Sequence, residues 1–134
     1  MRTYVLDSSA LWIFLQRKPA APKIAGLLGE ALRQRAEVIM STVNFGEIYG
    51  LVLREEGRDR ARAAAAIVYQ LPVLLTDATT QRCVDAAEIK WKYKLYYADA
   101  FAAALAIEKK ATLVTSDSDF RRLGHGFPVM WLKS

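Results

Sequence analysis

Residues 3–12 read TYVLDSSALW, and this stretch decides the fold that the sequence predicts. Residues 4–6 form a short apolar run, which is typical of a strand buried on both faces. Ser8 or Ser9 is expected to cap the helix that follows, because serine is a good N-cap residue. Asp7 therefore falls where a central strand ends and a helix begins, which is the edge of an open α/β sheet where ligands bind.

Strands and helices alternate along the rest of the chain. After a first helix that begins near Ala10, the hydrophobic spacing predicts helices at 21–35, 43–56, 58–70, 79–93 and 98–110 and a short helical turn at 117–123. Short apolar runs predict further strands at 38–40, 73–75, 111–114 and 128–132. This order predicts an α/β fold with a mostly parallel central sheet, helices on both faces and an inserted hairpin of two consecutive helices.

The composition is that of an ordinary globular protein with a basic excess. The chain has 134 residues, 53% of them hydrophobic, and a net charge of +5, so we expect one domain spanning residues 1–134. A single cysteine rules out an internal disulfide. We see no signal peptide and no apolar run long enough for a membrane span, which together favour a cytoplasmic location. The positive charge is compatible with a nucleic-acid partner.

Four acidic residues lie in apolar surroundings or at strand ends, and they are Asp7, Glu47, Asp99 and Asp117. Asp7 and Asp117 both follow strands, so they are expected at the same edge of a parallel sheet. Glu47 lies near the start of the helix that leaves this edge after the second strand. Asp99 opens a helix that a simple crossover would start at the opposite edge, so it joins the others only if residues 94–98 climb back.

Each of these acids also has a local interpretation, as a helix cap, a turn residue or a partner of the helix dipole. Gathered together, they would repel one another unless a cation lay among them. Carboxylate oxygens without histidine or cysteine favour Mg²⁺ or Mn²⁺. His125 is expected to be a turn residue and Cys83 a buried helix residue, so neither is assigned to the site.

The segments that carry these acids are DSS at 7–9, STVNFGE at 41–47, DA at 99–100 and TSDSDF at 115–120. Together these segments resemble the PIN domain and, more closely, VapC-type ribonuclease toxins of toxin–antitoxin pairs. The resemblance implies a three-layer α/β/α sandwich whose catalytic and metal-binding acids are Asp7, Glu47, Asp99 and Asp117. Ser9 and Thr115 match supporting hydroxyl residues, and Asp119 is either a further acid or, slightly favoured, the cap of the short helix. Unlike many relatives, residues 95–98 offer no Ser or Thr cap before Asp99.

The resemblance also implies the activity and the partners. A Mg²⁺- or Mn²⁺-dependent endoribonuclease of this kind would hydrolyse RNA with an activated water and leave 5′-phosphate and 3′-hydroxyl ends. The chain has no histidine pair for attack by a 2′-hydroxyl. Such toxins are usually homodimers and are inhibited by a VapB-like antitoxin. The alternative is a catalytically silent scaffold of the same fold that binds RNA or a partner.

An RNA substrate requires a basic surface near the acids. The candidates are Arg17, Lys18, Lys92, Lys94 and Tyr97. For the helix at 79–93 the alternative is that its basic residues form an ordinary solvated face, while Trp91, on the same side as Val84 and Ala87, lies in the core.

Two other protein classes fit the sequence poorly. A haloacid-dehalogenase-like phosphatase needs an acid where Ser9 stands, and a receiver domain needs a lysine before the last strand.

Overall fold

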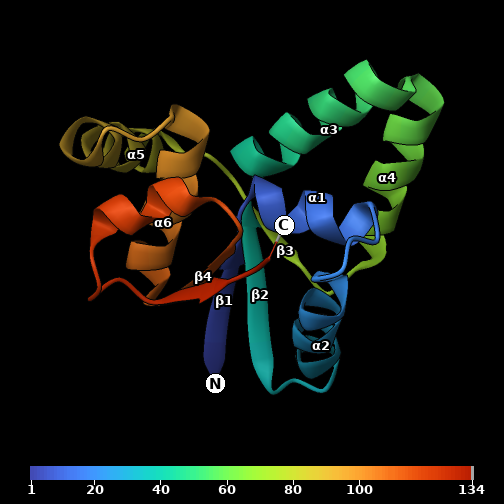
Figure 1. The fold of residues 1–134 in the computed structure, drawn as a ribbon, viewed down its shortest axis with the longest axis horizontal. Helices are drawn as coiled ribbons and strands as arrows, with labels where there is room; N and C mark the ends of the chain where they lie inside the picture. The colour runs from blue at the N-terminus through green and yellow to red at the C-terminus, as the bar shows by residue number, and fades with distance from the viewer. Residues whose placement is uncertain (134) are drawn as a thin grey trace.

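The computed structural model describes residues 1–133. Its strands are β1 (Arg2–Leu6), β2 (Ala36–Ser41), β3 (Leu74–Thr76), β4 (Thr112–Thr115) and β5 (Val129–Trp131). Its helices are α1 (Ser8–Leu15), α2 (Ala21–Leu32), α3 (Thr42–Glu56), α4 (Arg58–Gln70), α5 (Thr80–Tyr93), α6 (Tyr97–Lys109) and the 3₁₀ helix η1 (Ser118–Leu123). Each predicted element is present, with ends shifted by up to a few residues (Figure 1).

The strands form one sheet in the order β3-β2-β1-β4-β5. Every pair of neighbouring strands in the described part of the chain is parallel, which confirms and extends the prediction of a mostly parallel sheet. Val5 at the centre pairs with Ile39 on β2 and with Leu113 on β4. The carboxyl ends of β1 and β4, which carry Asp7 and Asp117, therefore lie side by side.

Helices cover both faces of this sheet. Val5 packs in a cluster formed largely by α6, whereas Tyr4 and Leu6 pack with residues of α1 and α2. This alternation is expected of a central strand whose successive side chains point to opposite faces. The molecule is the three-layer α/β/α sandwich that the resemblance implied (Figure 1).

The predicted inserted hairpin is α3 followed by α4. Gly57 joins the two helices with φ of +90°, a backbone conformation that glycine adopts without the penalty of a Cβ atom. Met40 from β2 and Leu11 from α1 pack against the hairpin in a third apolar cluster. The hairpin extends away from the sheet at the upper right of Figure 1.

For one helix, the side that was expected to pack in the core was predicted wrongly. The predicted helix at 79–93 forms as α5, but Val84 and Trp91 are exposed, Trp91 by 84%. The side of α5 that packs against α6 instead carries Ala86 and Ile89. The hydrophobic residues of α5 do not lie on a single side, so spacing alone did not identify the side that faces α6. None of the helices within residues 1–133 combines the length and the hydrophobicity that a membrane-spanning helix requires.

Candidate active site

Asp7 lies at the base of the site, at the end of β1, and the residue is 2% exposed. Its Oδ1 accepts hydrogen bonds from the Ala10 N–H at 2.9 Å and from the Ser9 hydroxyl at 2.7 Å, and its Oδ2 accepts one from the Thr115 hydroxyl. Asp7 is therefore the N-cap of α1, and the expectation that Ser8 or Ser9 caps this helix was wrong. An aspartate is as good a cap as a serine, and Asp7 is positioned for the role by the strand end.

Asp117 repeats this arrangement at the end of β4. Its Oδ1 accepts a hydrogen bond of 2.9 Å from the Asp119 N–H, so Asp117 is the N-cap of η1. The slight preference for Asp119 as the cap was wrong, because the residue directly after the strand again takes that position. The Thr115 hydroxyl donates a hydrogen bond to Asp7 and accepts one of 2.9 Å from the Asp117 N–H. A single hydroxyl group is therefore hydrogen-bonded to both of the acids that follow strands.

Asp99 reaches the same edge because α6 begins there. The side-chain amide of Asn44 at the start of α3 donates a hydrogen bond of 2.9 Å to the Ala98 carbonyl. In Figure 1, α6 runs alongside the sheet from the end where β1 and β2 finish. The condition that residues 94–98 return to this edge is therefore met. Lys94 ends α5 in the left-handed conformation, and α6 begins three residues later at Tyr97.

Glu47 comes from α3 on the other side of the group. Its Oε1 accepts a hydrogen bond from the Ser8 hydroxyl, and the side-chain amide of Asn44 donates to Ser8 Oγ at 3.2 Å. Glu47 is exposed, in contrast to the buried Asp7. Beyond the effect of burial, the charges of Asp117, Asp7 and Glu47 act on the pKa of Asp99, so acids from four separate elements lie near one another at the carboxyl edge.

Two of the four acids, Asp99 and Asp117, are close enough to Asp119 to share one ion with it, whereas Asp7 and Glu47 are not in this group. Among the described residues, Asp99, Asp117 and Asp119 each offer a carboxylate oxygen, and these oxygens lie within 4.8 Å of one another. Burial, followed by the charges of Asp117 and Asp7, raises the pKa of Asp99 to about 7. Burial also raises the pKa of Asp7 to about 6, against the lowering effect of its hydrogen bonds to Thr115 and Ser9.

This donor set fits a divalent cation. It consists of carboxylate oxygens with neighbouring hydroxyls, the hard ligands that Mg²⁺ and Mn²⁺ prefer. The raised pKa of Asp99 results in part from the charges of the acids around it. A divalent cation among them would remove that repulsion and favour the ionised form of each.

Two residues near the acids were missed from the sequence. Asn44 is completely buried, and it is in phase with the buried Ile48 and Val52 on α3. A polar residue in that apolar stripe was the signal that could have identified it. Arg122 donates to the Lys94 carbonyl at 2.8 Å and lies 3.7 Å from the Asp119 carboxylate. Nothing in its sequence context distinguishes Arg122 from other basic residues.

The candidate RNA-binding residues divide into two groups. Lys92, Lys94 and Tyr97 are exposed around the connection between α5 and α6, close in sequence to Asp99. The Tyr97 hydroxyl donates to the Cys83 carbonyl at 3.3 Å. Arg17 and Lys18 are also exposed but follow the far end of α1, roughly 12 Å along the helix axis from Asp7. The structure does not bring Arg17 and Lys18 to the acids.

The remaining sequence expectations concern single residues. Trp91 is exposed, so the alternative that it lies in the core was wrong. His125 is exposed in the turn between η1 and β5, as predicted. Cys83 is only partly buried on α5, and its thiol donates to the Ala78 carbonyl at 3.8 Å.

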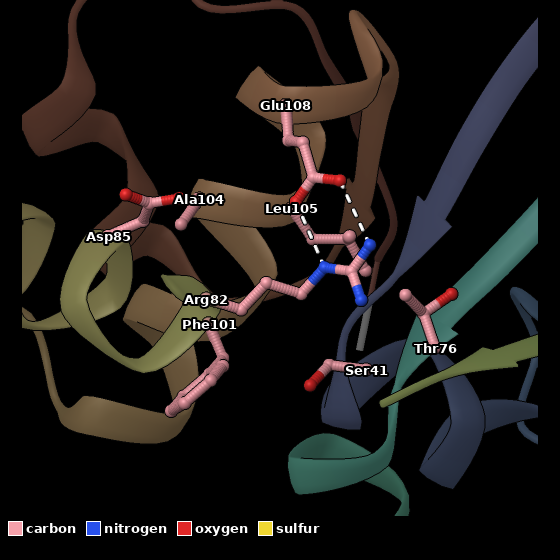
Figure 2. A pocket seen from close by; sticks show the side chains of 8 residues that line it. All are labelled: Ser41, Thr76, Arg82, Asp85, Phe101, Ala104, Leu105 and Glu108. Atoms are coloured by element: carbon pink, nitrogen blue, oxygen red, sulfur yellow. Dashed lines mark hydrogen bonds and ion pairs between the residues drawn. The ribbon is translucent and has the colours of Figure 1, made fainter. Parts of the chain in front are cut away.

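A separate small hollow lies between α5, α6 and the ends of β2 and β3 (Figure 2). Arg82 crosses it and makes two hydrogen bonds of 3.0 Å to the Glu108 carboxylate. The guanidinium also donates to the Asp77 carbonyl at 3.0 Å. The free volume is about 10 Å³, which is room for about one water molecule. The ion pair of Arg82 and Glu108 therefore joins α5 to α6, and the hollow around it is too small for a ligand larger than a water molecule.

Comparison with known proteins gives one family and a consistent set of folds. Residues 4–126 match the model of the PIN domain family, and no curated protein matches the sequence. The structure is similar to a chain of VapBC2 from Rickettsia felis, solved with promoter DNA, with a TM-score of 0.77, 15% identity and coverage of 98% of this chain and 99% of that one.

Two further solved structures are comparably similar. A chain of DNA-bound VapBC from Salmonella typhimurium has a TM-score of 0.72 at 18% identity, covering 97% of this chain and 98% of that one. VapC20 of Mycobacterium tuberculosis, described as a toxin that cleaves the sarcin-ricin loop, has a TM-score of 0.69 at 22% identity. The match covers 90% of this chain and 95% of VapC20. At such identities these structures establish a shared fold.

Proposed function

The chain belongs to the PIN domain family, and on that premise we propose that it is a metal-dependent endoribonuclease. The observation that carries the proposal is the approach of Asp99, Asp117 and Asp119 to within 4.8 Å, beside the buried Asp7. Burial and the charges of neighbouring carboxylates raise the pKa of Asp99, and such repulsion is costly for a purely structural role. In a nuclease the same arrangement serves to hold a divalent cation.

The chain's residues would divide the work as follows. Asp99, Asp117 and Asp119 would hold Mg²⁺ or Mn²⁺, with the buried Asp7 and the exposed Glu47 close to Asp99. When bound, the cation would supply an activated water and charge stabilisation for phosphodiester hydrolysis. Thr115 and Ser9 donate to Asp7 and so orient its carboxylate. Ser8 holds the Glu47 carboxylate in the same way.

We propose hydrolysis by water, leaving 5′-phosphate and 3′-hydroxyl ends. Attack by a 2′-hydroxyl is usually assisted by a general acid and a general base, most often histidines. The single histidine, His125, lies in the turn between η1 and β5, and no second histidine exists to complete a pair. The carboxylates at the strand ends instead match the requirements of cation-assisted hydrolysis.

The biological role that we propose is that of a cytoplasmic toxin in a VapBC-type pair. The similarity in fold to chains of VapBC complexes over nearly the whole chain supports it. The partners would be an RNA substrate, a VapB-like antitoxin and a second copy of the chain. The excess of 19 basic over 14 acidic residues is consistent with a polyanionic substrate.

The test is cleavage of end-labelled single-stranded RNA by the purified protein with Mn²⁺, with EDTA and as the Asp7→Asn variant. We expect cleavage only by the wild-type protein with Mn²⁺, with products that carry 5′-phosphate ends. Products ending in 2′,3′-cyclic phosphate would contradict the mechanism. RNA binding without cleavage under every metal condition would favour the silent scaffold.

A further inference from the structure

A cleft lies between η1, the loop at 124–128 and β5. Its lining includes Arg121, His125, Phe127 and Trp131, and its volume is about 530 Å³. None of the described residues that line it is acidic. The cleft therefore combines aromatic surface with positive charge, unlike the acidic group.

The sheet register fixes the position of this cleft relative to the acids. Trp131 on β5 is the register partner of Thr115 on β4, and the Leu132 N–H donates to the Thr115 carbonyl at 2.8 Å. Adjacent strands lie about 4.8 Å apart, and register partners in a parallel sheet present their side chains to the same face. Because Thr115 also donates to Asp7, Trp131 lies one strand away from the base of the site.

The other wall of the cleft also starts at the acids. The helix η1 is capped by Asp117 and carries Asp119 and Arg121. The Arg121 guanidinium lies 5.0 Å from the centre of the Trp131 indole ring. Trp131 is 38% exposed, and Arg121 makes no ion pair with a carboxylate within residues 1–133.

An exposed indole with a free guanidinium over it matches the chemistry of single-stranded RNA. Bases that are not paired stack on aromatic rings and on guanidinium planes, and basic side chains contact the adjoining phosphates. Because none of the described residues that line the cleft carries a carboxylate, the cleft also favours a polyanionic partner. Because Trp131 is the register partner of Thr115, the cleft is within reach of an RNA chain bound at the acids.

We propose that the cleft binds a nucleotide adjacent to the cleaved bond, with its base stacked on Trp131 and its phosphate contacted by Arg121. This assignment rests on the proposed ribonuclease function and adds to it a base-binding site that acts in substrate selection. Trp131 and Arg121 are binding residues that touch the substrate away from the reacting phosphate.

The test measures RNA affinity without cleavage. All proteins carry Asp7→Asn, and binding of a short, fluorescently labelled, single-stranded RNA of mixed sequence is followed by anisotropy. We expect Trp131→Ala to weaken binding by about 5-fold or more, since stacking contributes roughly 1–3 kcal/mol per base. Trp131→Phe should retain most of the affinity, and Arg121→Gln should weaken binding and reduce its dependence on salt. Tyr69→Ala is the control, because Tyr69 is an exposed aromatic on α4 that does not line the cleft.

A second readout separates this assignment from the proposed function. In the otherwise wild-type protein, Trp131→Ala should raise KM and alter the cleavage pattern while Mn²⁺ affinity stays unchanged. Unchanged affinity and pattern, with normal cleavage, would overturn the nucleotide site alone. The same result with a loss of self-association would identify the cleft as a protein contact. Absence of both RNA binding and cleavage in the unsubstituted protein would overturn the nucleotide site and the ribonuclease together.

Discussion

The side-chain amide of Asn44 donates a hydrogen bond of 2.9 Å to the main-chain carbonyl of Ala98. This bond joins the start of α3 to the start of α6, which are far apart in sequence. Glu47 follows Asn44 by three residues and Asp99 follows Ala98 by one residue, so this bond holds both acids at the same edge of the sheet. The same amide donates to Ser8 Oγ at 3.2 Å, so α1 is joined to the other two helices.

Replacement of Asn44 by Leu should therefore reduce both stability and activity. Leucine has a similar size but cannot donate to the Ala98 carbonyl or to Ser8, and an unsatisfied buried polar group costs about 1–3 kcal/mol. We expect the free energy of unfolding in urea to fall by that amount and RNA cleavage to fall by at least about tenfold, an effect comparable with the loss of an outer-shell contact. Gln70→Ala, an exposed change on α4, should alter neither quantity. Full activity of the Asn44→Leu protein would show that this bond does not position the acids.

The Thr115 hydroxyl should govern the affinity for the metal. Thr115→Val keeps the shape of the side chain but removes the donor to Asp7 and the acceptor for the Asp117 N–H. Since that hydrogen bond lowers the pKa of Asp7, its loss should raise this pKa further. Outer-shell contacts of this kind contribute about 10–100-fold to metal affinity, and we expect a Mn²⁺ affinity reduced within that range. Thr115→Ser should restore it, and equal affinities of the Val and Ser variants would refute the role.

The metal-free protein should be more stable at pH 5 than at pH 8. The folded-state pKa values of Asp7 and Asp99 are raised from 3.8 to about 6 and about 7. Between pH 4 and 7 the folded state therefore binds more protons than the unfolded state, and stability decreases as pH rises through the raised values. Thermal unfolding with EDTA across this range measures the effect.

Asp99→Asn provides the control for this pH dependence. It removes a negative charge from among Asp117, Asp7 and Glu47, so the metal-free variant should have a higher Tm than the wild-type protein at pH 8. Mn²⁺ should raise the Tm of the wild-type protein at pH 8 more than at pH 5, because protons compete with the cation for the same oxygens. A wild-type Tm that rose with pH in EDTA would contradict this account of the acids.

The sequence was sufficient to predict the acids at the strand ends. Asp7 and Asp117 each follow a short apolar strand, and parallel strands necessarily bring such residues to one edge. The position of Asp99 was harder, because it depends on where α6 begins, and α6 begins at the edge where Asn44 binds Ala98. That contact joins residues 54 positions apart, and no local pattern encodes it.

Local patterns were weakest where a residue has two plausible roles. Asp7 and Asp117 are both N-caps and candidate site acids, and the sequence analysis gave a cap only as the alternative interpretation of each, while it favoured Ser8 or Ser9 and Asp119 as the caps. Trp91 was ambiguous because an aromatic residue on an amphipathic helix can face either the core or solvent. The cleft at Trp131 depends on the register between β4 and β5, which spacing along the chain does not determine.

The most direct measurement is calorimetric titration of Mn²⁺ into the wild-type protein and into Asp99→Asn and Asp117→Asn at pH 8. Glu55→Gln is the matched control, since its carboxylate is exposed on α3. We predict binding by the wild-type and control proteins and an affinity at least about tenfold lower in the two aspartate variants. If all four proteins bound Mn²⁺ equally, or none did, the central claim that these carboxylates share a divalent cation would be wrong.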